Sequence, residues 1–329
     1  MSATYDIDHP ESFHGLPVFT LPAPGEPVPP GGLPEPGSVA WRLECAGYDS
    51  AQDFGTLWKH FADSVDRSRV WALLIGPWWD GEYSGFRPVV DLLVADADRF
   101  PALRALFLAD VVSEECELSW LQMCDVTPVF EAYPLLEEVT VRGCGGPGPS
   151  DEKLRLRPFR HGALRTLRFE SGGLPGHVVR ALGSCELPSL ERLELWLGVD
   201  WYGGDTTVDD LRPLLAGGLF PRLRHLGLQN SEIQDEIAAA LASAPVVAQL
   251  ESLSLAMGTL TDAGAEVLIG GQPLSHLARL DLYHHYVGEA VLGRLRDASA
   301  PAVVEADPGD TDDWDPEDED DMRYVAVGE

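Results

Sequence analysis

The sequence predicts an α/β solenoid, in which parallel strands form one sheet and helices cover its back. A leucine pattern typical of buried strands recurs along the chain, and successive copies are 26 to 33 residues apart. That spacing leaves room for one strand, one helix and the turns between them. One such unit cannot bury its own apolar face, so the units must stack on one another.

The strand pattern is L-x-x-L-x-L, with other apolar residues at some of its positions. Less regular copies begin at Val70 and Val303 and extend the series at both ends. Side chains of a strand alternate between two faces, so the pattern leucines should point into the core and the residues between them to the open, concave face. The seven clear copies begin at Leu103, Leu136, Leu164, Leu190, Leu223, Leu250 and Leu277.

The segments between the strands are expected to form helices on the convex side. Thr207-x-x-Asp210 has the spacing of a capping box at the start of one of them. Two segments carry apolar residues at helical spacing: Ile233, Ile237 and Leu241 in one, and Val287, Val291 and Leu295 in the other.

The chain divides into three parts at its changes of composition. Residues 1–37 hold nine of the 26 prolines and predict an extended N-terminal arm, whose apolar stretch 13–19 is expected to pack on the first turn of the solenoid. Residues 38–305 form the solenoid. Residues 306–329 are an acidic tail, expected to be largely disordered until residues 323–327 return to the body.

The charge of the chain limits the classes of partner. The formal net charge is −31, and residues 302–321 carry eleven carboxylates with no Lys or Arg. Such an excess repels phosphate backbones and anionic lipid, so nucleic-acid and membrane binding are disfavoured, whereas a basic protein is a natural partner. The sequence gives no sign of the oligomeric state.

The five cysteines indicate a reducing compartment. They are odd in number, contain no C-x-x-C pair and are expected to be buried free thiols. No basic segment precedes an apolar run at the N-terminus, and no apolar run of 18 residues occurs. These features predict a soluble cytoplasmic protein, and the excess of Arg over only two Lys is typical of a GC-rich bacterial coding sequence.

The strand pattern and the repeat lengths resemble the leucine-rich-repeat superfamily, in particular its ribonuclease-inhibitor-like class. The resemblance covers roughly residues 39–305 and implies a horseshoe with a parallel concave sheet and convex helices. The blocks 13–19, 192–199 and 323–327 also look like a bacterial family of single-domain repeat proteins without an assigned activity. Its members tend to be encoded beside radical-SAM-type and hydrolase-type proteins, which implies a partner role.

The turns depart from the superfamily pattern. The position three residues after the last pattern leucine usually holds Asn or Cys, whose side chains form a hydrogen-bonded ladder. Such a ladder is not expected here, because that position holds Gly172, Gly198, Ser231, Gly258 and His285.

Two motifs suggest phosphate binding, but another interpretation is favoured for each. Gly143–Gly148 matches G-x-G-x-x-G, yet Pro147 and Pro149 prevent the helix that should follow, which favours an insertion loop. The basic residues after it either contact a phosphate or acid or form a solvated strand edge, and the second is favoured. They are Lys153, Arg155, Arg157 and Arg160.

Metal-ligating residue types occur together at His284 and His285, beside Asp281 and Tyr283. Neighbouring residues of a strand point to opposite sides, so the two histidines cannot both chelate without a bend. His285 is therefore a weak candidate, and we expect no metal site. No nucleophile elbow or Walker lysine occurs, so we expect no catalytic residue and no cofactor.

The open face supplies the candidate binding residues, because it places aromatic anchors among charges of both signs. Trp78–Trp79 and Trp201–Tyr202 lie in turns that leave strands; they widen this site if exposed and belong to the core if buried. The candidates are Arg168, Glu170, Arg192, Glu194, Trp196, His225, Gln229, Arg279, Asp281 and Tyr283, with Glu138, Thr140, Arg142 and Thr166 beside them.

Three functions fit these observations. The first is a non-enzymatic scaffold that holds a protein or peptide partner on the concave face, with Trp196 and Tyr283 as anchors. The second, by analogy with acidic inhibitors in the same superfamily, is capture of a basic enzyme or toxin. The third is an enzyme whose site gathers Glu170, His225, Asp281 and His285 around a pocket on that face.

Overall fold

The computed structural model describes residues 7–45, 53–79, 84–145, 153–309 and 323–328. Within them the chain is α/β, with one sheet whose strands lie in the order β1 to β12. The first pair is antiparallel, and every later pair is parallel. Residues 146–152 of the Gly-rich loop and residues 310–322 of the acidic tail lie outside the described residues.

The described strands and helices alternate through most of the chain. The strands are β1 Ser12–Phe13, β2 Leu16–Thr20, β3 Ala40–Leu43, β4 Ala72–Ile75, β5 Ala105–Leu108, β6 Glu138–Arg142, β7 Thr166–Glu170, β8 Arg192–Gly198, β9 His225–Ser231, β10 Ser252–Ser254, β11 Arg279–Asp281 and β12 Val303–Glu305. The helices are α1 Phe54–Ser64, α2 Arg87–Ala95, α3 Thr127–Ala132, α4 Gly176–Leu182, α5 Val208–Leu215, α6 Gln234–Leu241, α7 Asp262–Gly270 and α8 Glu289–Ser299.

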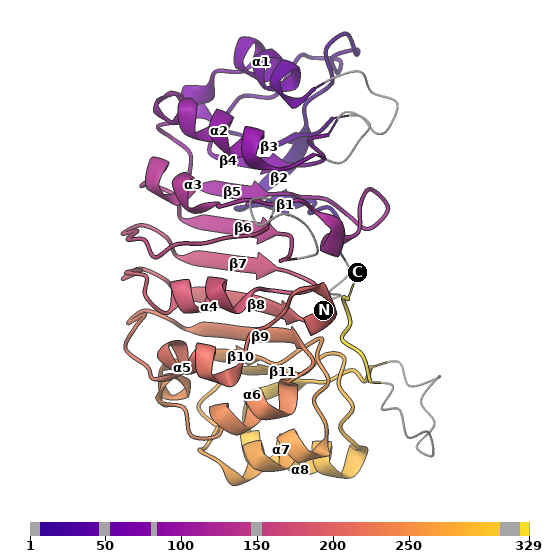
Figure 1. Cartoon of the computed structure of the whole chain (residues 1–329), viewed down its shortest axis with the longest axis vertical. Coiled ribbons are helices and arrows are strands. Elements are labelled where there is room, and N and C mark those ends of the chain that lie inside the picture. The colour runs from indigo at the N-terminus through magenta and orange to yellow at the C-terminus, as the bar shows by residue number, and fades with distance from the viewer. Residues whose placement is uncertain (1–6, 46–52, 80–83, 146–152, 310–322, 329) are drawn as a thin grey trace.

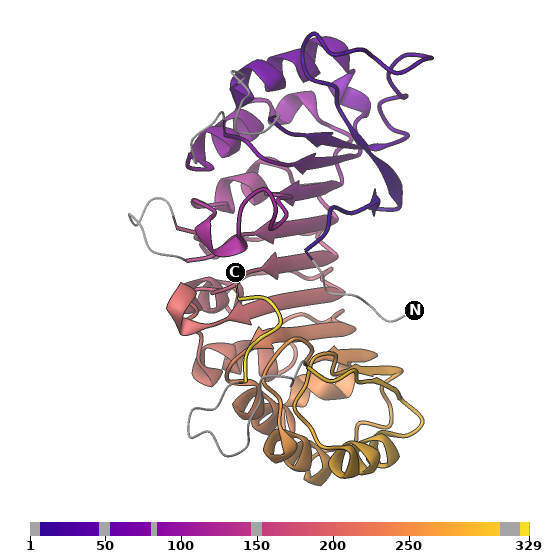
Figure 2. The same ribbon diagram turned by 90° about the vertical axis from the view of Figure 1, so that its right-hand side faces the viewer.

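The predicted strand copies coincide with β4 to β12, so the predicted α/β class and parallel sheet are confirmed. The helices lie on one side of the sheet, and we call the other side the open face (Figures 1 and 2). The predicted capping box is present at α5, where Thr207 and Asp210 bond reciprocally. None of the described helices is long and apolar enough to cross a membrane.

The core is a row of pattern residues that pair in register from strand to strand. Leu73, Leu106, Val139, Leu167, Leu193, Leu226, Leu253 and Leu280 are aligned across β4 to β11, and all are fully buried. Each such side chain contributes roughly 1.5–3 kcal/mol on burial, and the row continues through every unit. The five cysteines are buried, as expected.

The N-terminal segment differs from the predicted arm. β2 pairs with β3, so the sheet begins before residue 38, and β1 folds back on β2 through His14 and Gly15, both with the positive φ that a two-residue hairpin needs. Phe13 is buried against β3 to β5 on the open face rather than on a turn. The physical reason is that alanines leave space there: Ala40, Ala72 and Ala105 occupy the outward positions of these strands.

The C-terminal segment returns to the body, as predicted. Residues 323–328 lie across the ends of the lower strands, and the segment Val325 to Val327 bonds to the turns after β9 and β10. Val325 and Val327 are buried. This edge, where strands end and turns toward the helices begin, is called the carboxyl edge below.

Candidate functional site

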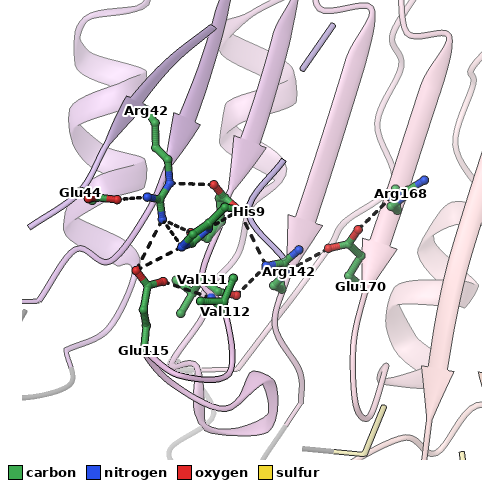
Figure 3. A network of polar contacts seen from close by, with 10 residues as sticks. His9, Arg42, Glu44, Val111, Val112, Glu115, Arg142, Arg168 and Glu170 are labelled. Atoms are coloured by element: carbon green, nitrogen blue, oxygen red, sulfur yellow. Dashed lines mark hydrogen bonds and ion pairs between the residues drawn. The ribbon is translucent and has the colours of Figure 1, made fainter. Parts of the chain in front are cut away.

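A line of alternating charges crosses the open face from β3 to β9, and we call it the charge ladder. Each carboxylate in it lies between cationic or imidazole groups from neighbouring strands, and Figure 3 shows its first part. Its members are Arg42, Asp110, Arg142, Glu170, Arg168, Glu194, Arg192 and His225.

Asp110 joins the first two arginines of the ladder and is fully buried. Arg42 Nε donates to Asp110 Oδ2 at 2.9 Å, and Arg142 Nη1 lies 3.8 Å from Asp110 Oδ1. Arg142 also donates to the Val111 carbonyl at 2.6 Å and to Glu170 Oε2 at 2.8 Å (Figure 3). These buried charges are paired and hydrogen-bonded, which is the condition under which a protein interior tolerates them.

His9 attaches the N-terminal segment to this end of the ladder (Figure 3). Its Nδ1 lies 3.4 Å from Asp110 Oδ1, and its Nε2 lies 3.4 Å from Glu115 Oε1 and 3.0 Å from Arg42 Nη2. Bonds to the two carboxylates raise the pKa of His9 to about 9, because they outweigh burial and the charge of Arg42.

The titration of His9 tests this attachment. We expect an imidazole pKa near 9 by NMR in the folded chain, and a lower pKa in Glu115→Gln, which removes the second carboxylate. Since the folded pKa exceeds the unfolded one, the attachment stabilises the fold fully below about pH 6.5 and is lost as the pH rises toward 9. A folded-state pKa at or below the ordinary histidine value would contradict it.

Glu194 is the centre of the ladder. Its carboxylate contacts Arg168 Nε, lies 2.6 Å from Arg192 Nη2 and lies 3.1 Å from His225 Nε2. Burial disfavours the charged form, but Arg168, His225 and Arg192 outweigh it and hold the pKa of Glu194 well below its ordinary value. Burial lowers the pKa of His225, whose Nδ1 lies 2.7 Å from Ser252 Oγ. A neutral ring with its proton on Nε2 suits both contacts.

A second line of polar contacts continues from β8 to β12. Trp196 Nε1 donates to Gln229 Oε1 at 3.2 Å, and Gln229 Nε2 lies 2.7 Å from Ser254 Oγ. Ser254 Oγ donates to Asp281 Oδ2 at 3.3 Å, and Arg279 bridges Asp281 to Glu305 on the last strand. Trp196 is thus held inside the molecule by a chain of side-chain bonds.

The expected exposure of the candidate residues is wrong for most of them. The structure brings all ten onto one face, but Trp196 retains only 4% of its accessible surface. Parallel strands lie roughly 5 Å apart, so long side chains lie across their neighbours and cover one another. Partly exposed are Arg168, Arg192, Arg279 and Tyr283; buried are Glu170, Glu194, Trp196, His225, Gln229 and Asp281.

The groups of the predicted enzyme site do not converge on a cavity. Glu170 lies on β7, His225 on β9 and Asp281 on β11, each is bonded to its own neighbours, and none of them lines any of three cavities found among the described residues. His285 Nδ1 accepts from the Val287 amide at 3.0 Å. Among the described residues no group of three His, Cys, Asp or Glu could hold a metal.

Exposed tryptophans lie instead at the carboxyl edge. Trp201, in the 3-10 turn Asp200–Tyr202 after β8, has 82% of its surface exposed. Trp120, in the 3-10 turn Leu118–Trp120 after β5, has 61% exposed. Tryptophan is one of the residue types enriched at the hot spots of protein interfaces, and two exposed ones lie at this one edge.

A chain of contacts links the two turns in the middle of the stack. Ser119 Oγ donates to the Gly328 carbonyl at 2.9 Å. A Cβ added at Gly328 would lie 4.0 Å from Tyr202 Cε2, so the end of the C-terminal segment also lies near the second turn. Gly198, with φ +69°, is the last residue of β8 before the second turn. The next amide, Val199 N, donates to the Gly172 carbonyl at 2.8 Å and ties the start of this turn to the neighbouring unit. Trp120 and Trp201 therefore belong to one region.

Only some of these exposed aromatic residues can be predicted from the sequence. For both aromatic pairs the sequence leaves open whether they are exposed or buried. Trp201 is exposed. Trp78 and Trp79 are buried and pack against each other, with 5.0 Å between their ring centroids. Trp120 was missed, since it lies in an irregular segment outside the leucine pattern. Its only signal is a large aromatic side chain in a polar turn.

Comparison with known proteins relates the chain to a solved structure. No protein-family model and no curated protein matches it. The chain is similar to the crystal structure of a protein from Bacteroides fragilis, with a TM-score of 0.70 and 25% sequence identity over 87% of this chain and 78% of that one. The name of that protein states no activity. The likeness agrees with the α/β, repeat-like fold.

Proposed function

We propose that this chain is a leucine-rich-repeat solenoid that acts as a non-enzymatic scaffold for a protein or peptide partner. The repeat assignment is supported by the in-register leucine row and by the strict sequential order of β2 to β12. The observation that carries the binding role is the exposure of Trp201 at 82%. Tryptophan is among the residue types most enriched at the hot spots of protein interfaces.

The partner surface is the carboxyl edge around Trp201 and Trp120 rather than the centre of the open face. Most polar groups of the open face already bond to one another, so a partner there would have to break these bonds. At the edge, Asp200, Asp205 and Glu232 are exposed around Trp201. The partner is thus a protein that offers an apolar pocket with basic groups at its rim.

Removal of the exposed indole tests this function. A partner recovered from the native cell should bind Trp201→Ala at least tenfold more weakly than the unchanged chain, as expected for a hot spot of about 2 kcal/mol. Trp71→Ala is the matched control, because Trp71 is 50% exposed at the opposite edge, just before β4. Equal loss in both variants, or none in either, would contradict the proposed surface.

Salt dependence separates this scaffold from capture of a basic enzyme. The −31 charge of the chain makes such capture fall steeply as the salt concentration rises. Binding through Trp201 should fall less steeply over the same range, because salt weakens only the contacts of the basic rim groups and hardly affects burial of the indole.

A further inference from the structure

The C-terminal segment 323–328 packs along a row of turns at the carboxyl edge, and the surface that holds it is called the groove below. The segment forms no helix or strand, has a bend at Ala326 and crosses several units in the reverse of their chain order (Figure 1). It meets the turn after β11 first, then the turn after β10 and the end of β9, and reaches Ser119 after β5.

The groove holds this segment mainly through its backbone. Asn230, which is fully buried, accepts from the Val327 amide at 2.9 Å and donates to the Val327 carbonyl at 2.5 Å. The Ala326 amide donates to the Met257 carbonyl at 2.8 Å. His284 Nε2 lies 2.9 Å from the Tyr324 carbonyl and must donate to it. A two-bond clasp by a buried side-chain amide recognises extended backbone whatever its side chains.

Side-chain selectivity comes from alternate positions of the segment. Val325 and Val327 are 5% and 8% exposed, while Tyr324 and Ala326 face outward. This is the period of two of an extended strand with one buried face. The groove therefore takes aliphatic side chains at every second residue.

The groove is built from one structural device repeated in three units. Asn230, Met257 and His284 occupy the same position in three successive repeats, four residues after the aligned leucines of β9, β10 and β11, and each has positive φ, at 53°, 70° and 55°. Residues other than glycine rarely adopt this conformation, and it marks sites where the surrounding structure imposes it. Here it places a group of each turn against the segment.

We propose that this groove is a binding site for peptides with aliphatic residues at alternate positions, and that residues 323–328 are its intramolecular ligand. A free peptide of the same sequence then competes with the tethered copy. Because tethering gives a local concentration in the millimolar range, the free peptide binds the unchanged chain poorly. This site stands whether or not Trp201 binds a partner.

The test uses the full chain with its own segment disabled. In the double variant Val325→Asp with Val327→Asp, the two buried positions carry charges and the segment leaves the groove. A fluorescent peptide of residues 323–329 should then bind at least about tenfold more tightly than it binds the unchanged chain, by fluorescence anisotropy. Val28→Asp with Val303→Asp is the matched control, since both valines are exposed. It should bind the peptide no better than the unchanged chain.

Adding Asn230→Leu to the double variant should abolish peptide binding. Circular dichroism and a melting curve check that each variant is folded. A folded double variant that does not bind the peptide would overturn the proposal, as would equal binding to the unchanged chain. If the double variant does not fold, a site-specific protease sequence placed within residues 310–322 replaces it. After cleavage, the labelled peptide should exchange with the native segment; a native segment that stays until the protein unfolds would also overturn the proposal.

Discussion

Glu194→Gln is expected to lower the free energy of unfolding by about 3 kcal/mol, the lower end of the range for breaking a buried ion pair. The variant keeps the shape of the side chain but leaves Arg168, Arg192 and His225 without their shared carboxylate. The lower end applies because the two arginine side chains are 37% and 44% exposed and can recruit water. Urea unfolding at neutral pH measures the effect.

The matched control is Glu251→Gln. Glu251 pairs with Arg224 at 3.7 Å, and their side chains are 71% and 57% exposed, so its loss should cost less than about 1 kcal/mol. At acidic pH the difference in the free energy of unfolding between Glu194→Gln and the unchanged chain should become smaller. The folded pKa of Glu194 lies below its ordinary value of 4.5, so its contribution is present above that pH and lost as the pH falls further. Equal losses for the two variants at neutral pH would mean that the ladder does not stabilise the fold.

Gly198→Ala is expected to lower the free energy of unfolding by at least about 4 kcal/mol, among the largest effects of a single substitution. Gly198 has φ +69°, and a Cβ there would lie 1.9 Å from the Gly172 carbonyl oxygen. The obstacle is backbone, which cannot rotate away. The turn that carries Trp201 begins at this glycine, so any folded remainder should also have a displaced indole.

Gly293→Ala is the control with the opposite sign. Gly293 lies inside α8 with nothing within 4 Å of the added Cβ, so the substitution should raise the free energy of unfolding by about 0.5–1 kcal/mol through helix propensity. Thermal unfolding of Gly198→Ala and Gly293→Ala measures both changes in the free energy of unfolding. A mild effect at position 198 would show that the contact with Gly172 is not rigid.

The sheet could be predicted because its signal is local and repeated. Each strand carries its own leucines. The spacing between copies leaves room for only one helix and its turns, which predicts that consecutive strands are neighbours in the sheet. The register can be predicted as well, because only the alignment of positions such as Leu193 and Leu226 places the pattern leucines of both strands on the buried face.

The state of the open face could not be predicted from single strands. Whether Trp196 is exposed depends on Gln229, which lies 33 residues away and reaches it only across the strand boundary. In retrospect the opposite charges at neighbouring outward positions, Arg168 beside Glu194, indicate that these groups pair. The alanines of β3 to β5 likewise indicate that a large side chain, Phe13, covers them.

Photo-cross-linking in the native cell tests the central claim, that the carboxyl edge rather than the open face meets the partner. A benzophenone amino acid is placed at position 201, at position 192 on the open face, or at position 71 on the opposite edge. A specific adduct is expected from position 201 and none from positions 192 and 71. An adduct from position 192 without one from position 201 would contradict it.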